Sequence, residues 1–132
     1  MAKKELIYLK EGHLHTSPIP QGVKAGGFIF LSALRGVVDG TTKPPEDLDE
    51  QVAALFVNMR HALEAAGATL DDVVRVAIYM TELQEGRKVL NKHWAENFGD
   101  NTPSRFAVEV TDMGGPGDNS KVLAEVIAIV PE

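Results

Sequence analysis

The chain has 132 residues, of which 44% are hydrophobic and 24% charged, a balance that suits one folded domain over residues 1–132 and argues against long disorder or a repeat architecture. The formal net charge of −6 disfavours nucleic acid as a partner, because phosphate binding needs a basic surface and the Lys and Arg residues are scattered. The absence of cysteine excludes disulfides and sulfur-bound zinc, and no apolar run could span a bilayer, so we expect a cytoplasmic protein without a membrane role.

The start of the sequence predicts a short strand and a hairpin. Residues 5–9 indicate the short strand. The pair Gly26-Gly27 separates residues 22–25 from the apolar run 28–31, which indicates a tight hairpin that feeds a buried strand. Turn signals between residues 39 and 45 then predict a loop.

An amphipathic helix follows this loop, because apolar residues recur at spacings of three and four. They are Leu48, Val52, Leu55, Phe56, Met59 and Leu63. The helix is predicted to begin near Pro45, since proline suits a first helical turn, and to end at Gly67.

A strand and a second helix come next. Residues 73–80 are β-branched and apolar with Arg75 as the only charge, which indicates a strand covered on at least one face. Thr81 with Gln84 three residues later resembles a capping box, so we expect it to open a helix that Gly99 ends.

Two strands complete the predicted sheet. Residues 105–110 alternate in polarity, and residues 122–130 are apolar except for Glu125; a polar glycine-rich loop at 114–117 lies between them. The order of elements predicts an α+β fold, a sheet with both helices on one face. Because the strands are apolar on both sides, we expect the other face to be buried against copies of the same chain.

Arg105 is the first candidate functional residue. It stands where the proline-containing loop 102–104 leads into a strand, and a guanidinium at a strand end can bind a carboxylate through two parallel hydrogen bonds. By itself the residue fits a solvated charge or a surface ion pair better.

Glu125 is the second candidate. By the two-residue period of a strand it shares a face with Leu123, Ile127 and Ile129, which places a carboxylate among apolar side chains. We expect it to be shielded or paired. A carboxylate in this position fits two roles. One is a general acid or base, and the other is the buried partner of an arginine such as Arg75.

The histidines and serines carry weaker signals. His13 and His15 form an H-x-H pair, but no third ligand stands at a recognisable spacing, so no metal site is predicted. His61 and His93 lie near apolar helix stripes and are expected to be hydrogen-bonded. Ser32 has neither a nucleophile elbow nor a His-Asp pair, which argues against a serine hydrolase.

Motifs along almost the whole chain resemble the reactive-intermediate deaminase (Rid, YjgF or L-PSP) family. They are Pro18-x-Gln-Gly-Val, Phe28-Ile-Phe-Leu-Ser32, Gln51, Asn58, Ala65-Ala-Gly67, Asp72-Val-Val, Asn91, Pro103-Ser-Arg105 and Ala124-Glu-Val-Ile-Ala128. The resemblance implies a chorismate-mutase-like, YjgF-type fold, a mostly antiparallel sheet with two helices, assembled as a homotrimer with a cleft at each subunit interface.

The resemblance also implies an activity. Members hydrolyse reactive enamines and imines such as 2-aminoacrylate to a 2-keto acid and ammonia, without a metal or cofactor. Arg105 would then hold the substrate carboxylate, and Ser32, Asn91 and the backbone amide of Ala107 would line the pocket. Ile19 and Gln21 belong to the same expected substrate site.

Two positions depart from the family pattern. Ile19 replaces a tyrosine of the better-studied branch, and Leu123 replaces the glutamate that helps to activate water. Glu125 is the nearest available replacement, so Arg105 and Glu125 are the predicted catalytic residues. The alternative is a non-catalytic trimeric ligand-binding or chaperone-like module that uses the same Arg105 pocket. The endoribonuclease activity ascribed to some relatives is unattractive here, given the acidic charge and the missing acid.

Overall fold

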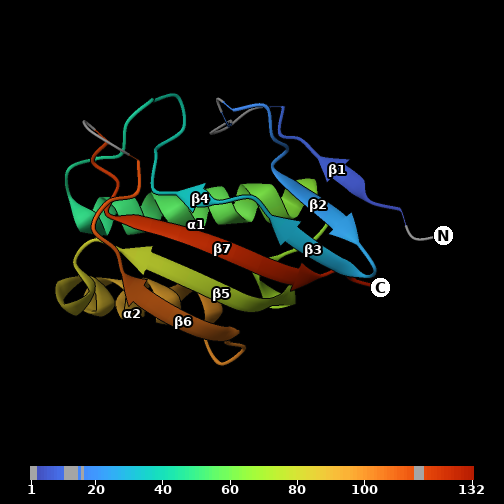
Figure 1. Cartoon of the computed structure of the whole chain (residues 1–132). Helices are drawn as coiled ribbons and strands as arrows, with labels where there is room; N and C mark the ends of the chain where they lie inside the picture. Colours follow the sequence, from blue (N-terminus) through green and yellow to red (C-terminus); the bar gives the residue numbers. More distant parts are fainter. Residues whose placement is uncertain (1–2, 11–14, 16, 115–117) are drawn as a thin grey trace.

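The computed structural model describes residues 3–10, 15, 17–114 and 118–132, and it shows one sheet with two helices behind it (Figure 1). The strands are β1 Glu5–Ile7, β2 Gly22–Ala25, β3 Phe28–Leu31, β4 Leu34–Arg35, β5 Val73–Met80, β6 Ser104–Glu109 and β7 Val122–Ile129. The helices are α1 Leu48–Ala65 and α2 Leu83–Phe98, with a 3₁₀ turn, η1, at Leu70–Asp72.

The strands lie in the order β1-β2-β3-β7-β5-β6, and the short β4 pairs with β7 beyond the end of β3. Strands β5 and β6 run parallel, since α2 connects them as a crossover, and the other paired strands in the described chain run antiparallel. The prediction of an α+β fold with a mostly antiparallel sheet and both helices on one face is therefore confirmed at the level of the single chain (Figure 1).

The core lies between the sheet and the helices. Strand β7 turns Val122, Ala124, Val126 and Ala128 toward α1, and all four are buried. The apolar stripe predicted for α1 is buried against them, as the spacing of its residues requires. No helix in the described part of the chain is long and apolar enough to cross a membrane.

The start of α2 differs from the prediction. Its N-cap is Glu82, which makes no side-chain capping bond, so the capping box expected from Thr81 and Gln84 is wrong. Instead, the backbone N–H of Leu83 donates to Oε1 of Glu109 at 3.0 Å. A carboxylate at a helix N-terminus satisfies an unpaired donor and complements the helix dipole, and here a neighbouring strand provides it.

Strand β4 and the turn η1 were not anticipated. A two-residue strand is too short to show a periodic pattern, and β4 is held from outside: Nδ2 of Asn58 on α1 donates to the carbonyls of Arg35 and Val37 at 2.9 and 2.8 Å. The helix α1 thus fixes the chain immediately after β3 by side-chain hydrogen bonds.

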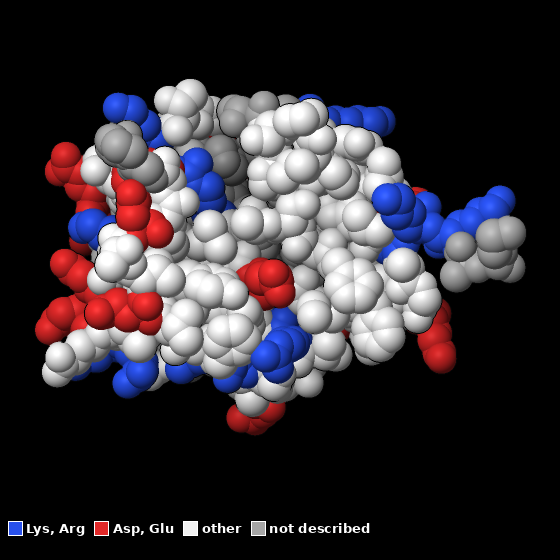
Figure 2. All heavy atoms as spheres, in the orientation of Figure 1, with Lys and Arg blue, Asp and Glu red and all other residues white. Residues whose placement is uncertain are grey.

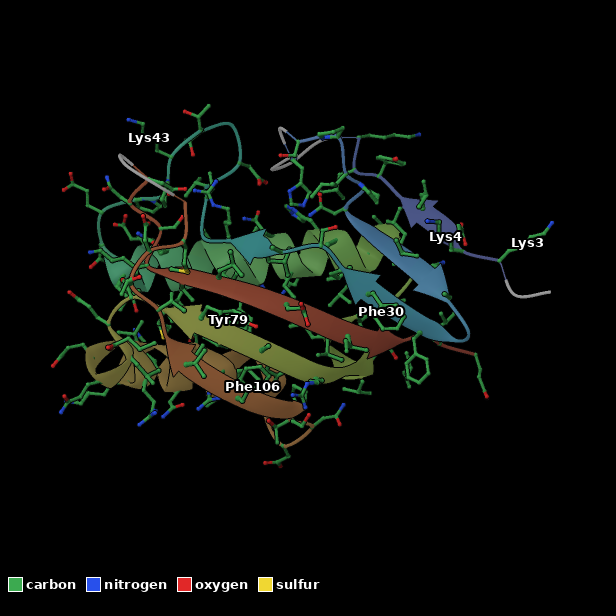
Figure 3. The ribbon with its side chains drawn as sticks, viewed as in Figure 1. Lys3, Lys4, Phe30, Lys43, Tyr79 and Phe106 are labelled. Carbon is green, nitrogen blue, oxygen red and sulfur yellow. The ribbon has the colours of Figure 1, made fainter. Side chains whose placement is uncertain are left out.

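The face of the sheet away from the helices, termed here the open face, is largely apolar and uncovered in the single chain. Figure 2 shows a mostly uncharged area over the strands, interrupted near its middle by one acidic and one basic patch, and Figure 3 shows Phe30, Tyr79 and Phe106 along it. Its exposed apolar side chains include Phe28, Phe30, Phe106, Val108 and Ile129. Strand β3, expected to be buried, is therefore buried on its helix side alone.

Candidate functional site

Arg105 lies on β6 and faces α2. Alternation along the strand turns Arg105, Ala107 and Glu109 to the helix side and Phe106 to the open face. The guanidinium lies over the ring of Trp94, with Cζ 4.9 Å from the ring centroid. Within the part of the chain that the structure describes, the Arg105 guanidinium donates no hydrogen bond and forms no ion pair, so its planar N–H groups are available to a ligand.

Two contacts fix how α2 lies along β6. The Leu83 amide bonds Glu109 near the end of β6, and Trp94 contacts Arg105 near its beginning, so the helix and the strand run in opposite directions. Arg87 and Asn91 precede Trp94 by seven and three residues and share its side of the helix. They therefore lie between the two contacts, alongside Ala107.

The electrostatics of this region favour an anion. Partial burial lowers the pKa of Arg105 from its ordinary value, and the nearby positive charge of Arg87 lowers it further. Both effects disfavour the charged guanidinium that β6 presents. A bound carboxylate would offset both, because it supplies the opposite charge and accepts the unused donors.

Ser32 and Gln21 form a second group, beside β2 and β3 and away from β6. The Ser32 hydroxyl donates to the carbonyl of Pro20 at 2.8 Å, and the Ser32 amide donates to the carbonyl of Gln21 at 2.9 Å. Gln21 is buried, whereas Ile19 is exposed and lines a depression of about 360 Å³ with Gln21, His15 and neighbouring residues. This group is ordered by backbone contacts.

Glu125 stands on the open face of β7, which it shares with Leu123 and Ile127 as predicted. Its side chain is exposed, however, so the expectation that its strand neighbours shield it is wrong for the single chain. It also forms no ion pair with Arg75 in the described structure; the Arg75 guanidinium lies over the Phe106 ring at 5.0 Å instead. Because β3 ends and β4 begins beside it, Glu125 is next to the bend at Ser32.

Comparison with known proteins identifies the family. The family model described as "Endoribonuclease L-PSP" matches residues 15–130. The chain belongs to the Rid/YjgF/L-PSP family.

Relatives and solved structures agree with the assignment to the Rid family. A "RutC family protein" of Pyrococcus abyssi is 35% identical over 127 residues, covering 96% of this chain and 95% of that protein. The "Reactive Intermediate Deaminase A, chloroplastic" of Arabidopsis thaliana is 29% identical, covering 96% of this chain and 66% of the relative. The crystal structure of RidA from an Antarctic Psychrobacter superposes with a TM-score of 0.86 at 28% identity, covering 96% of this chain and 99% of the other.

The site residues predicted for this Rid-family chain fall into two groups. Arg105, Asn91 and Ala107 lie together at the β6 margin, and Ser32 lies beside Glu125 near the middle of the sheet. Strands β7 and β5 separate β3 from β6, so about 14 Å of sheet lies between the groups. One chain therefore does not bring all the predicted residues into a single pocket.

Reasoning from sequence did not single out Trp94 and Arg87, which lie near Arg105 in the structure. Their signal was the seven-residue spacing on α2, which places both on the flank that carries Asn91. That spacing gains meaning only when the position of α2 along β6 is known.

The histidines have ordinary roles where the structure describes them. His93 is buried and its Nε2 lies 2.9 Å from Asp49, which confirms the hydrogen bond expected for it, whereas His61 Nδ1 lies 3.5 Å from Asp39. His13 lies outside the described residues. Burial lowers the pKa of His15, and the charge of Arg35 lowers it further. The described residues include no cluster of three or more His, Cys, Asp or Glu that could hold a metal.

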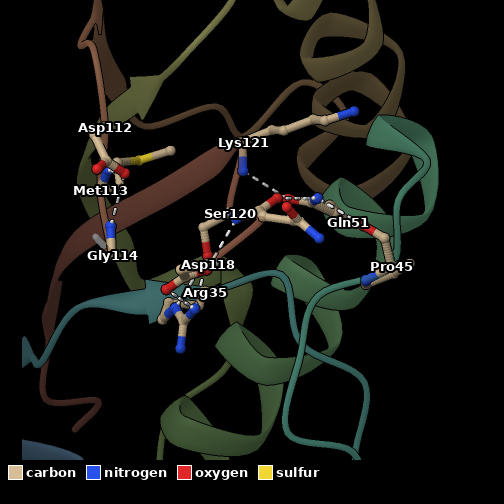
Figure 4. A network of polar contacts seen from close by, with 10 residues as sticks. Arg35, Pro45, Gln51, Asp112, Met113, Gly114, Asp118, Ser120 and Lys121 are labelled. Atoms are coloured by element: carbon tan, nitrogen blue, oxygen red, sulfur yellow. Dashed lines mark hydrogen bonds and ion pairs between the residues drawn. The ribbon is translucent and has the colours of Figure 1, made fainter. Parts of the chain in front are cut away.

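A polar network beside the site has a structural role (Figure 4). Gln51 on α1 is fully buried; its Nε2 donates to the carbonyls of Pro45 and Asn119 at 2.7 and 2.8 Å, and its Oε1 accepts from the Lys121 amide at 2.8 Å. Gln51 was one of the motif residues of the family. Because these hydrogen bonds occupy the amide of Gln51 within the chain, Gln51 stabilises the fold and does not bind a ligand.

The segment before β7, residues 118–121, also hydrogen-bonds Arg35 of β4 (Figure 4). Arg35 donates to Asp118 and to the Ser120 hydroxyl, the latter at 2.8 and 3.2 Å. Its donors are thus directed into the chain, which ties the segment leading into β7 to β4.

Proposed function

We propose that this protein is a cofactor-independent hydrolytic deaminase of small carboxylate-bearing enamines and imines. The observation that carries the proposal is the unpaired Arg105 guanidinium, held on Trp94 at the β6 margin in a chain of the Rid family. Relatives whose names include "reactive intermediate deaminase" support this reaction class.

The reaction needs little beyond positioning. An enamine first takes up a proton on carbon and becomes an imine. Water then adds to the imine carbon, and a proton moves to nitrogen. The C–N bond breaks, which releases ammonia and forms the 2-keto acid. Arg105 holds the carboxylate in a fixed orientation, which keeps the imine carbon in reach of water. Asn91 and the backbone amide of Ala107 line the same side of the pocket.

Glu125 is the candidate for moving the proton. It is the acidic residue nearest to Ser32 in the sheet, and its strand neighbours Leu123 and Ile127 are apolar. Covering this face would exclude bulk water from around the carboxylate and hold it beside the pocket, where it can act as a general acid or base.

A homotrimer would supply that cover and complete the site. Two observations support the proposal: the open face exposes several large apolar side chains, and the two groups of site residues lie on separate parts of one chain. If one protomer's β6 margin meets another protomer's β3–β7 face, Arg105 and Ser32 line one pocket between subunits. A solution mass measurement at micromolar concentration that gives a stable monomer would refute this assembly.

The activity is tested with 2-aminoacrylate generated in situ, whose disappearance is followed by absorbance with and without the protein. The expected result is faster loss of the transient with the parent and no acceleration with Arg105→Lys. If the protein binds keto acids but does not accelerate the loss of 2-aminoacrylate, it is a non-catalytic ligand-binding module and not a deaminase. No binding and no acceleration would refute both.

A further inference from the structure

A second arginine, Arg87, lies close enough to Arg105 for its charge to act on it. Arg87 is exposed on α2, one turn before Asn91 and on the flank that faces β6. In the described chain it takes part in no ion pair or hydrogen bond. Glu109, on the helix-facing side of β6, accepts a hydrogen bond from the Leu83 amide and forms no ion pair with Arg87 among the described residues.

The other arginines of the chain are engaged. Arg35 is paired with Asp118, Arg60 donates to Asn97, and Arg75 lies over the Phe106 ring. Arg105 and Arg87 thus differ from them, because two positive charges share one margin of the sheet with no acidic partner among the described residues. Burial chiefly lowers the pKa of Arg105, and the like charge of Arg87 lowers it further.

Arg105 and Arg87 act at different positions along the axis of α2. Trp94 holds the Arg105 guanidinium, whereas Arg87 is two turns away, roughly 10 Å along the helix axis toward the end of β6. The long arginine side chains shorten that separation. A monocarboxylate on Arg105 leaves the Arg87 charge uncompensated, and a ligand with a second anionic group a few bonds away compensates both.

We propose that Arg87 makes this site selective for dianionic substrates, the imines or enamines of 2-amino dicarboxylic acids. The 1-carboxylate binds Arg105 on Trp94, and the side-chain carboxylate binds Arg87 beside Ala107. The inference rests on the proposed function, since it assumes that Arg105 holds the substrate carboxylate.

Calorimetry with two keto acids of equal carbon chain, 2-oxoglutarate and 2-oxopentanoate, tests the selectivity. They differ in the second carboxylate, so the parent protein should bind 2-oxoglutarate about 5- to 20-fold more tightly, as expected for one added charge-assisted contact at a partly exposed site. The preference should shrink as ionic strength rises.

Matched variants then assign the preference. Arg87→Gln should remove it while leaving 2-oxopentanoate affinity within about twofold, because the Arg105 contact remains. Lys88→Gln removes the same charge from the adjacent exposed position, which points to another side of the helix, and should keep the preference. Arg105→Lys should weaken both ligands.

The outcomes separate the two proposals. Equal affinity of the parent for both keto acids, a preference that survives Arg87→Gln, or an equal loss in Lys88→Gln overturns the role of Arg87 and leaves the Arg105 site standing. Failure of the parent to bind either keto acid overturns the proposed function as well.

Discussion

Two half-buried arginines in this sheet have opposite surroundings. Arg35 on β4 directs its donors to Asp118 and Ser120, while Arg105 on β6 has the Trp94 ring beneath it and no hydrogen-bond partner in the described chain. A desolvated guanidinium without acceptors is unfavourable, so a fold that keeps one leaves it for a ligand. The comparison distinguishes a region that stabilises the fold, the stability region, from the proposed binding region.

The stability region should be most sensitive at Gln51. Gln51→Leu removes three hydrogen bonds and leaves two carbonyls and an amide without partners, so the free energy of unfolding should fall by about 3 to 5 kcal/mol. Urea unfolding at one fixed protein concentration measures it, since assembly makes apparent stability depend on concentration.

The matched control is Gln84→Leu, the same change at an exposed position of α2, which should alter stability by no more than about 0.5 kcal/mol. A Gln51→Leu variant as stable as this control would mean that the network of Figure 4 contributes nothing to the fold.

The binding region should respond in affinity instead. Arg105→Lys keeps the charge but loses the planar pair of donors, so binding of a 2-keto acid product analogue should weaken by about 2 to 4 kcal/mol, roughly thirty-fold to several hundred-fold. Calorimetry measures the loss, and urea unfolding should show unchanged stability. Undiminished binding in Arg105→Lys or Arg105→Ala would remove Arg105 from the site.

Much of the fold could be predicted because its signals are local. The stripe of α1 and the alternation of β6 and β7 follow from residue spacing, and the hairpin at Gly26-Gly27 follows from two glycines that adopt positive φ angles of 59° and 84°. The start of α2 could not be predicted, because its capping oxygen belongs to Glu109, 26 residues away.

The site could be predicted in part, for a related reason. Arg105 is recognisable from its motif, but its lack of a partner and the contributions of Trp94 and Arg87 depend on how α2 lies along β6. The exposure of Glu125 could not be predicted for a different reason. Its apolar strand neighbours can be identified in the sequence, but neighbours on one flat sheet face cannot cover a side chain without a second layer of structure.

Arg35→Lys should give the reverse of Arg105→Lys. Lysine cannot reach Asp118 and Ser120 with the same forked geometry, so the variant should lose about 1 to 2 kcal/mol of unfolding free energy. Arg60→Lys is the control, because Arg60 is exposed on α1 and its side-chain hydrogen bond in the described chain is to Asn97. Urea unfolding that ranks Arg35→Lys with this control would erase the contrast between the two regions.

The smallest predicted effect is a pH dependence at Asp118. Burial alone raises the pKa of its carboxyl, but the hydrogen bonds from Ser120 and the Arg35 guanidinium outweigh burial and hold the pKa below its usual range. The unfolded chain therefore takes up this proton first as the pH falls, so the stabilising contribution is complete above the ordinary Asp pKa of about 3.9 and is lost as the pH falls through the lower folded pKa.

Asp118→Asn removes this contribution at every pH. The parent should exceed the variant in unfolding free energy by up to about 1 kcal/mol near pH 7, a modest size because the pair is partly exposed to solvent. Below the folded pKa, where Asp118 is neutral in both states, the difference should vanish. Urea midpoints of both proteins across this range measure it, and a difference that stays constant with pH would show that Asp118 acts through shape and not through its charge on Arg35.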